Sequence, residues 1–259
     1  MKLVSATAEA TVDLEGGRLA SLIVGGHELL VAEGEKPTRW GSFPMIPWCG
    51  RLPYGRLAFD GQEYEFPLTS PPHANHGRSH LQPWYEVEPG VIRTALGEPW
   101  PFGGYAVQRF ELGPASLSIT AEVRADHHAM PAMLGWHPWF RRMIGPGPVA
   151  ELQISGGRVY AVNDDLIPTG VLEPVPHPPW NACFVGLDAD PVIEWPGLLR
   201  LTVSSDLDHW VIFTEPEHAL CIEPQSGPPN EFHMAPRVLQ PGEFLSGTMT
   251  LSWELPARP

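Results

Sequence analysis

Residues 245–255 read LSGTMTLSWEL, and their apolar side chains fall at every second position. Ser, Thr and Glu occupy the positions in between, as on either side of Leu251 and Trp253. A period of two is typical of a strand with one buried face and one solvated face. Residues 116–125, SLSITAEVRA, repeat this pattern with Leu117 and Ile119 on the apolar side. Both stretches therefore predict long β-strands in an antiparallel sheet.

Shorter apolar runs recur along the chain, at residues 19–24, 152–154, 199–203 and 210–213. Turn signals rich in Gly and Pro separate these runs. The sequence contains 31 Pro and 26 Gly, which disfavours a helical protein. No segment keeps a sustained 3.6-residue period with helix caps. We therefore expect an all-β fold, built as an antiparallel sandwich or a barrel.

The composition limits the domain organisation, the partners and the location of the protein. The 259 residues contain no linker, charge block or clear repeat, so we expect one domain over residues 1–259. A net charge of −14 disfavours nucleic acid and anionic membrane surfaces as partners. No apolar run is long enough to span a bilayer and no signal peptide is evident, which favours a cytoplasmic location. Cys49, Cys183 and Cys221 form no CxxC pair, and we expect them to be buried, reduced thiols.

The first candidate for chemistry is His137, within the stretch GWHPWF at residues 135–140. The proline that follows disfavours a helical conformation at His137 and favours extended backbone. Burial among aromatic side chains would lower the pKa of the imidazole and keep it neutral near pH 7. These residues alone fit a packed core histidine as well as they fit a catalytic one.

The second candidate is Glu223, at the end of the apolar run in ALCIEPQSGPPN, residues 219–230. Apolar surroundings raise the pKa of a carboxyl group toward the range that suits a general base. A glutamate that simply ends an exposed strand is the commoner case when the motif is read alone.

Two loops carry further polar groups. Residues 71–80, PPHANHGRSH, bring together three imidazoles and a guanidinium. Their spacing matches no HxH or HExxH pattern, so we favour hydrogen bonding to hydroxyl groups over a metal. Residues 47–56, PWCGRLPYGR, place Arg51 in a turn rich in Gly and Pro. Arg51 is either a surface charge or a rigid, planar hydrogen-bond donor for a ligand.

Six motifs, in this order and over nearly the whole chain, resemble the aldose 1-epimerases, or galactose mutarotase-like proteins. The motifs are Gly50-Arg51-Leu52 with Gly55-Arg56, Asn75-His76-Gly77, WHPWF at 136–140, LIPTG at 166–170, EPQSGPPN at 223–230 and VLQPGE at 238–243. The WHPWF and Glu-Pro-Gln segments are the specific ones.

The resemblance implies a large antiparallel β-sandwich with a cleft for a small-molecule sugar. It implies an isomerase that interconverts sugar anomers with no cofactor and no metal. In this family pattern Glu223 is the general base at the C1 hydroxyl and His137 is the general acid at the ring oxygen. The residues expected to contact the sugar are Arg51, His76, Asn181 and Gln225. Either a monomer or a homodimer is compatible with the pattern.

Asn181 is a departure, because relatives often carry Asp at the matching position. An amide offers one acceptor and two donors where a carboxylate only accepts, which leaves the identity of the sugar open. One alternative is a hexose-6-phosphate mutarotase, with Arg51, Arg56 and Arg78 as the candidate cations. Another is a non-catalytic carbohydrate-binding protein on the same fold. A glycoside hydrolase would need two carboxylates, and Glu223 is the one well-placed candidate.

Overall fold

The two long alternating stretches lie next to each other in the fold. In the computed structural model, which describes residues 1–256, β13 (Ser116–Arg124) runs antiparallel to β25 (Phe244–Glu254). Leu117 lies opposite Leu251, and the apolar side chains of both strands are buried at alternate positions. The predicted strands and their buried faces are confirmed.

These strands belong to the smaller of two large antiparallel sheets. The eight-stranded sheet has the order β10 (Tyr85–Glu88), β11 (Val91–Ala95), β12 (Tyr105–Leu112), β13, β25, β21 (Leu199–Ser205), β20 (Val192–Trp195) and β16 (Glu151–Gln153). The eleven-stranded sheet has the order β1 (Lys2–Val4), β2 (Ala8–Asp13), β3 (Arg18–Val24), β5 (Ser42–Pro44), β15 (Trp136–Arg141), β23 (Ala219–Gln225), β22 (His209–Phe213), β19 (Asn181–Leu187), β17 (Gly156–Val162) and β18 (Pro168–Glu173), with β4 (His27–Glu28) paired to β3.

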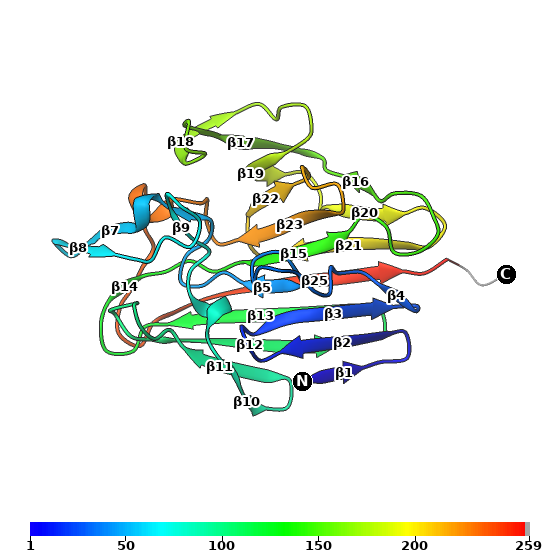
Figure 1. Cartoon of the computed structure of the whole chain (residues 1–259), viewed down its shortest axis with the longest axis horizontal. Helices are drawn as coiled ribbons and strands as arrows, with labels where there is room; N and C mark the ends of the chain where they lie inside the picture. The colour runs from blue at the N-terminus through cyan, green and yellow to red at the C-terminus, as the bar shows by residue number, and fades with distance from the viewer. Residues whose placement is uncertain (257–259) are drawn as a thin grey trace.

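The two sheets pack face to face around a common core, and Figure 1 shows them as overlapping layers. Buried polar groups also join the layers. Trp136 of β15 donates its indole N–H to the Gln108 side-chain oxygen of β12 at 3.1 Å, and Gln108 Nε2 donates to the Gly17 carbonyl at 2.7 Å. Each buried group thereby keeps a hydrogen-bond partner, as a dry interface requires. The expected all-β antiparallel sandwich is confirmed.

Smaller elements decorate the sandwich. Three two-stranded sheets are β14 (Met130–Pro131) with β24 (Val238–Leu239), β6 (Arg51–Leu52) with β9 (Ala74–Asn75), and β7 (Arg56–Phe59) with β8 (Gln62–Glu65). Three 3-10 turns are η1 (Pro53–Gly55), η2 (Ser79–Leu81) and η3 (Glu231–His233). Among residues 1–256, none of the helical segments is long and apolar enough to cross a membrane. The single domain expected over residues 1–259 includes three C-terminal residues that lie outside the described part.

Two central strands of the larger sheet, β15 and β23, are buried on both faces. One face packs into the core between the sheets, where Trp136 lies. Because side chains alternate along a strand, His137 and Trp139 point to the opposite face of the same sheet. That face carries the cavity described next.

Candidate active site

A cavity of about 350 Å³ opens on the outer face of the eleven-stranded sheet. Residues in or next to β6, β9 and β18 line its other walls. All six site residues expected from the sequence line this one cavity, although they come from five different strands and loops of the chain. They are His137, Glu223, Arg51, His76, Asn181 and Gln225.

His137 and Glu223 meet across β15 and β23. The antiparallel register pairs Trp139 with Cys221 and Gly135 with Gln225, so His137 lies directly opposite Glu223. His137 Nε2 is 3.3 Å from Glu223 Oε1. Both side chains are nearly inaccessible to solvent, with exposed fractions of 7% and 2%. An imidazole and a carboxyl group therefore lie close enough together, at the floor of the cavity, to exchange a proton or to act on two neighbouring oxygens of one ligand.

Aromatic rings fix the orientation of His137. Its ring stacks on Phe43 with a centroid distance of 4.8 Å and on Trp139 at 5.2 Å, with only 7° between the last two planes. This packing confirms the extended, aromatic environment predicted from the WHPWF motif. Burial lowers the pKa of His137 to about 3.

Glu223 is buried with one side-chain partner. Gln225 Nε2 donates to Glu223 Oε2 at 3.4 Å. Burial raises the pKa of Glu223 well above its usual value, while the hydrogen bond from Gln225 and the positive charge of Arg51 oppose that rise. Gln225 is fully buried in the cavity wall, and its side-chain hydrogen bond is the one to Glu223.

His76 lies on the turn that follows β9, and its ring centroid is 5.1 Å from that of His137. Its Nδ1 accepts a hydrogen bond from the Gly50 N–H at 3.3 Å. A neutral imidazole that accepts at Nδ1 carries its proton on Nε2, so this ring presents a donor. Gly77 makes the turn possible, because its φ is +65° and a Cβ there would overlap the Ile46 carbonyl.

Arg51 and Asn181 lie at the mouth of the cavity. Arg51 Nη1 donates to the Leu166 carbonyl at 3.4 Å, which ties β6 to the loop before β18. Asn181 Nδ2 donates to Glu215 Oε2 at 3.5 Å. Glu215 thus places a carboxylate beside the position where Asn replaces the usual Asp.

Sequence reasoning missed other residues of the cavity wall. Lys36, Thr38 and Arg39 come from the loop before β5, and the Arg39 guanidinium lies 5.5 Å from the ring centroid of Trp139. Their loop has no motif, only scattered charges. Cys221 is a buried thiol, as the sequence predicts, and it does not line the cavity; its place near Glu223 follows from the strand face that they share.

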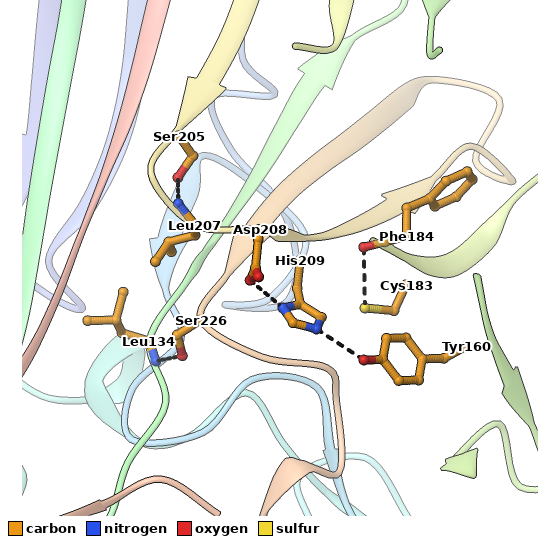
Figure 2. Close-up of polar contacts among 9 residues, drawn as sticks. All are labelled: Leu134, Tyr160, Cys183, Phe184, Ser205, Leu207, Asp208, His209 and Ser226. Atoms are coloured by element: carbon orange, nitrogen blue, oxygen red, sulfur yellow. Dashed lines mark hydrogen bonds and ion pairs between the residues drawn. The ribbon is translucent and has the colours of Figure 1, made fainter. Parts of the chain in front are cut away.

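A second polar network lies beside the cavity, on the same strands. Asp208 Oδ1 is 2.7 Å from His209 Nδ1, and His209 Nε2 is 3.1 Å from the Tyr160 hydroxyl. Figure 2 shows this chain running from the turn before β22 to β17, close to Cys183. The register places His209 opposite Gln225. Asp208 is committed to His209 and does not line the cavity.

The three histidines of the 71–80 loop each have a backbone partner at Nδ1. His73 Nδ1 accepts from the Tyr54 N–H at 3.1 Å, and His80 Nδ1 lies 3.1 Å from the His76 carbonyl. His76 is engaged with Gly50 as described above. The rings are thus held apart by separate backbone contacts.

Comparisons with known proteins identify the family of the chain. A sequence model of the family aldose 1-epimerase matches residues 2–252. The uncharacterized protein YphB of Escherichia coli K12 is 24% identical over 243 residues, which is 82% of this chain and 83% of YphB.

Solved structures show the same fold. A galactose mutarotase-like protein from Clostridium acetobutylicum superposes with a TM-score of 0.83 at 17% identity, over 98% of this chain and 95% of that one. Galactose 1-epimerase from Lactobacillus acidophilus gives a TM-score of 0.77 at 15% identity, over 98% and 93% of the two chains. With the match over residues 2–252, the chain belongs to the aldose 1-epimerase family.

Proposed function

We propose that this protein is a mutarotase, an isomerase that interconverts the α and β anomers of a free hexose or a related aldose. The observation that carries the proposal is the pair His137 and Glu223, 3.3 Å apart at the floor of a cavity of about 350 Å³. Family membership supports the same reaction class.

The reaction needs two proton transfers at neighbouring oxygens. Glu223 removes the proton of the C1 hydroxyl while His137 protonates the ring oxygen. The C1–ring-oxygen bond breaks, and the electron pair of the former O–H bond forms the C1 carbonyl. Rotation about C1–C2 presents the other carbonyl face. The C5 hydroxyl then attacks C1, returning its proton to His137 as Glu223 protonates the carbonyl oxygen, so both side chains regain their starting states.

The burial of the pair favours this cycle. Ring opening converts a carboxylate and an imidazolium into a neutral carboxylic acid and a neutral imidazole. A site that raises the pKa of Glu223 and lowers that of His137 stabilises the neutral forms. The pKa shifts therefore favour the ring-opened stage of the cycle, while in the free site the same shifts favour the neutral pair over the ion pair.

The remaining site residues would bind the sugar. His76 Nε2–H supplies a donor at a fixed angle, and Arg51 supplies a planar donor group. Gln225 is positioned to hold Glu223 as well as to contact a hydroxyl group. The Asn181 and Glu215 pair would contribute one acceptor and one donor near the mouth.

A phosphorylated hexose is the second candidate substrate, because Lys36 and Arg39 line the cavity together with Arg51. None of these three cations forms an ion pair within the described residues. The other cations considered from the sequence are placed differently: Arg56 is an exposed partner of Glu65 at 3.7 Å, and Arg78 lies outside the lining.

Exchange NMR on free and phosphorylated aldoses tests the proposal. Catalysed exchange between the two anomeric C1–H signals is expected for at least one sugar, and the preferred substrate identifies the class. If the protein binds a sugar but accelerates exchange of none in the panel, it is a non-catalytic carbohydrate-binding protein.

A further inference from the structure

Three potential metal ligands converge where β15 and β23 pair: His137 and Glu223, which line the cavity, and Cys221, which does not. They are here called the His–Cys–Glu cluster. A ring nitrogen of His137, Cys221 Sγ and a carboxylate oxygen of Glu223 all lie within 4.8 Å of one another. All three residues are buried. Within residues 1–256, no other group of three or more His, Cys, Asp and Glu side chains brings its ligand atoms this close together.

The strand geometry explains the convergence. Cys221 and Glu223 are two residues apart on β23, so both point to the cavity face. His137 lies opposite Glu223 on β15, and Trp139 lies opposite Cys221. The cluster therefore rests on two central, hydrogen-bonded strands, which hold side chains more rigidly than loops do.

We propose that the His–Cys–Glu cluster binds a thiophilic divalent cation, Zn²⁺ or Cd²⁺, and that this binding inhibits the enzyme in competition with the sugar. The inhibition rests on the mutarotase function proposed above, whereas the binding does not. Thiolate, imidazole and carboxylate are the three protein ligand types that zinc uses most.

The distances suit a tetrahedral ion after a small adjustment. Bond lengths of about 2.0–2.3 Å place the ligand atoms of a tetrahedral zinc site about 3.3–3.6 Å apart. His137 Nε2 and Glu223 Oε1 already have this spacing, at 3.3 Å. The other ligand atoms lie within 4.8 Å of one another, so a shift of the thiol sulfur by at most about 1 Å would complete this spacing. The fourth position faces the cavity, where water or a sugar oxygen would complete the coordination.

Charge also favours the ion. A thiolate and a carboxylate together neutralise a divalent cation, so the buried site carries no net charge when filled. Binding releases the thiol proton and the proton shared by His137 and Glu223. With its ligands occupied by the metal, the pair can neither donate nor accept a proton at the sugar.

Other clusters in the molecule are less suited to a metal. The imidazoles of the 71–80 loop use Nδ1 for separate backbone contacts. In the Asp208, His209 and Tyr160 chain, both ring nitrogens of His209 already have partners. By contrast, His137 Nδ1 is buried with no hydrogen-bond partner in the described part of the chain, so this ring nitrogen is not committed to another residue.

Cadmium spectroscopy without sugar tests the site directly. Titration of Cd²⁺ into the full chain should produce the ultraviolet charge-transfer band of a cadmium thiolate, with a stoichiometry of one. Zn²⁺ should displace the Cd²⁺ and remove the band. Absence of the band in the unmodified protein would overturn the proposal, and this result does not depend on any variant folding.

Two cysteine variants locate the thiol. Cys221→Ser should lose the band and weaken zinc affinity, measured by calorimetry, by at least about tenfold. Cys183→Ser is the matched control, because Cys183 is, like Cys221, a buried free thiol, and it lines the cavity but lies outside the cluster. Equal loss in both variants, or loss only in the control, contradicts the assignment to Cys221.

Kinetics test the inhibition separately. Zn²⁺ should slow anomer exchange in the unmodified protein and in Cys183→Ser, higher sugar concentration should reduce the effect, and a chelator should restore the rate. In Cys221→Ser the inhibited fraction, relative to that variant's own rate, should fall sharply. Metal binding without catalysis of any sugar would remove the mutarotase proposal and keep the site, whereas catalysis without metal binding would do the reverse.

Discussion

Glu223 and His137 show how burial shifts the pKa values of two neighbouring side chains in opposite directions. The pKa of the carboxyl group rises and that of the imidazole falls, and desolvation is the largest cause of both shifts. The carboxyl group accepts a hydrogen bond from Gln225, and the imidazole is stacked between the rings of Phe43 and Trp139.

The first prediction concerns these two residues. Glu223→Gln should abolish catalysed anomer exchange, and His137→Asn should lower kcat by about 10²–10⁴-fold, the usual range for loss of a general acid or base. Exchange NMR and polarimetry measure both rates, with circular dichroism to confirm folding. Glu231→Gln is a matched control, because Glu231 is a largely buried carboxyl group that does not line the cavity. Near-normal activity in Glu223→Gln, or an effect of His137→Asn on KM alone, would refute the assigned roles.

The second prediction concerns the stability effect of Glu231. Burial raises its pKa to about 7, and Oε2 has no hydrogen-bond partner in the described residues. A raised pKa means that the folded state holds the proton more tightly, so stability is lost as the pH rises from about 4.5 to about 7. Because the group is partly exposed, we expect Glu231→Gln to stabilise the protein by about 1–2 kcal/mol at pH 8.

Urea unfolding at two pH values measures this effect. The stability difference between Glu231→Gln and the unmodified protein should be much smaller at pH 4.5, where Glu231 is protonated in the folded state and about half protonated in the unfolded chain. A difference that is equal at pH 4.5 and pH 8 would show that ionisation of Glu231 is not its cause.

At the scale of elements, the turn after β9 is the support for His76. Gly77 has a left-handed φ of +65° and lies against the Ile46 carbonyl, so any side chain there meets both strain and a clash. Gly61, with a φ of +72°, has open space around it. Substituting Gly61 therefore adds backbone strain alone, whereas substituting Gly77 adds backbone strain and a steric clash.

The third prediction uses that contrast. Gly61→Ala should cost about 1 kcal/mol of stability and leave catalysis unchanged, since only strain is added. Gly77→Ala should cost more, and it should raise KM because the turn that carries His76 must shift. Urea unfolding and steady-state kinetics measure the two effects. Equal losses of stability in the two variants, with KM unchanged, would show that this turn does not position His76.

At the scale of the whole molecule, buried ionisable groups govern the response to acid. Burial holds the pKa of His80 and His137 at about 3 and that of His76 well below its usual value. These imidazoles bind protons mainly after unfolding, so their effect on stability is full above about pH 6.5 and is lost as the pH falls. Glu223 and Glu231 oppose this trend above about pH 4.5, because only the folded state protonates them there.

The fourth prediction is the shape of the stability curve. As the pH falls from about 6.5 to about 4.5, the three imidazoles lower the stability of the fold and the two carboxyl groups raise it. Because the imidazoles are more numerous, we expect a small net loss of stability over this range. Below about pH 4.5 the carboxyl groups are protonated in both states, and the loss should become steeper. Urea unfolding from pH 7 to pH 3.5 measures the slope. A slope that stays constant or flattens below pH 4.5 would contradict this account.

Sequence pattern predicted some strands well and others poorly. β13 and β25 have one face toward the core, and their alternation was visible in residues 116–125 and 245–255. β15 and β23 are buried on both faces, which removes the period-two signal. Around the site, only the family motifs pointed to these two strands.

The sequence by itself therefore determined the all-β class, the alternating faces of the exposed sheet strands and the residue types in the six motifs. Only the tertiary structure decided that His137 faces Glu223 at 3.3 Å, that Gln225 holds that carboxyl group, and that Cys221 joins the pair. It also placed Lys36 and Arg39 at the cavity. The physical reason is that strand order and register between distant segments follow from packing two sheets around one core, and no local pattern encodes that packing.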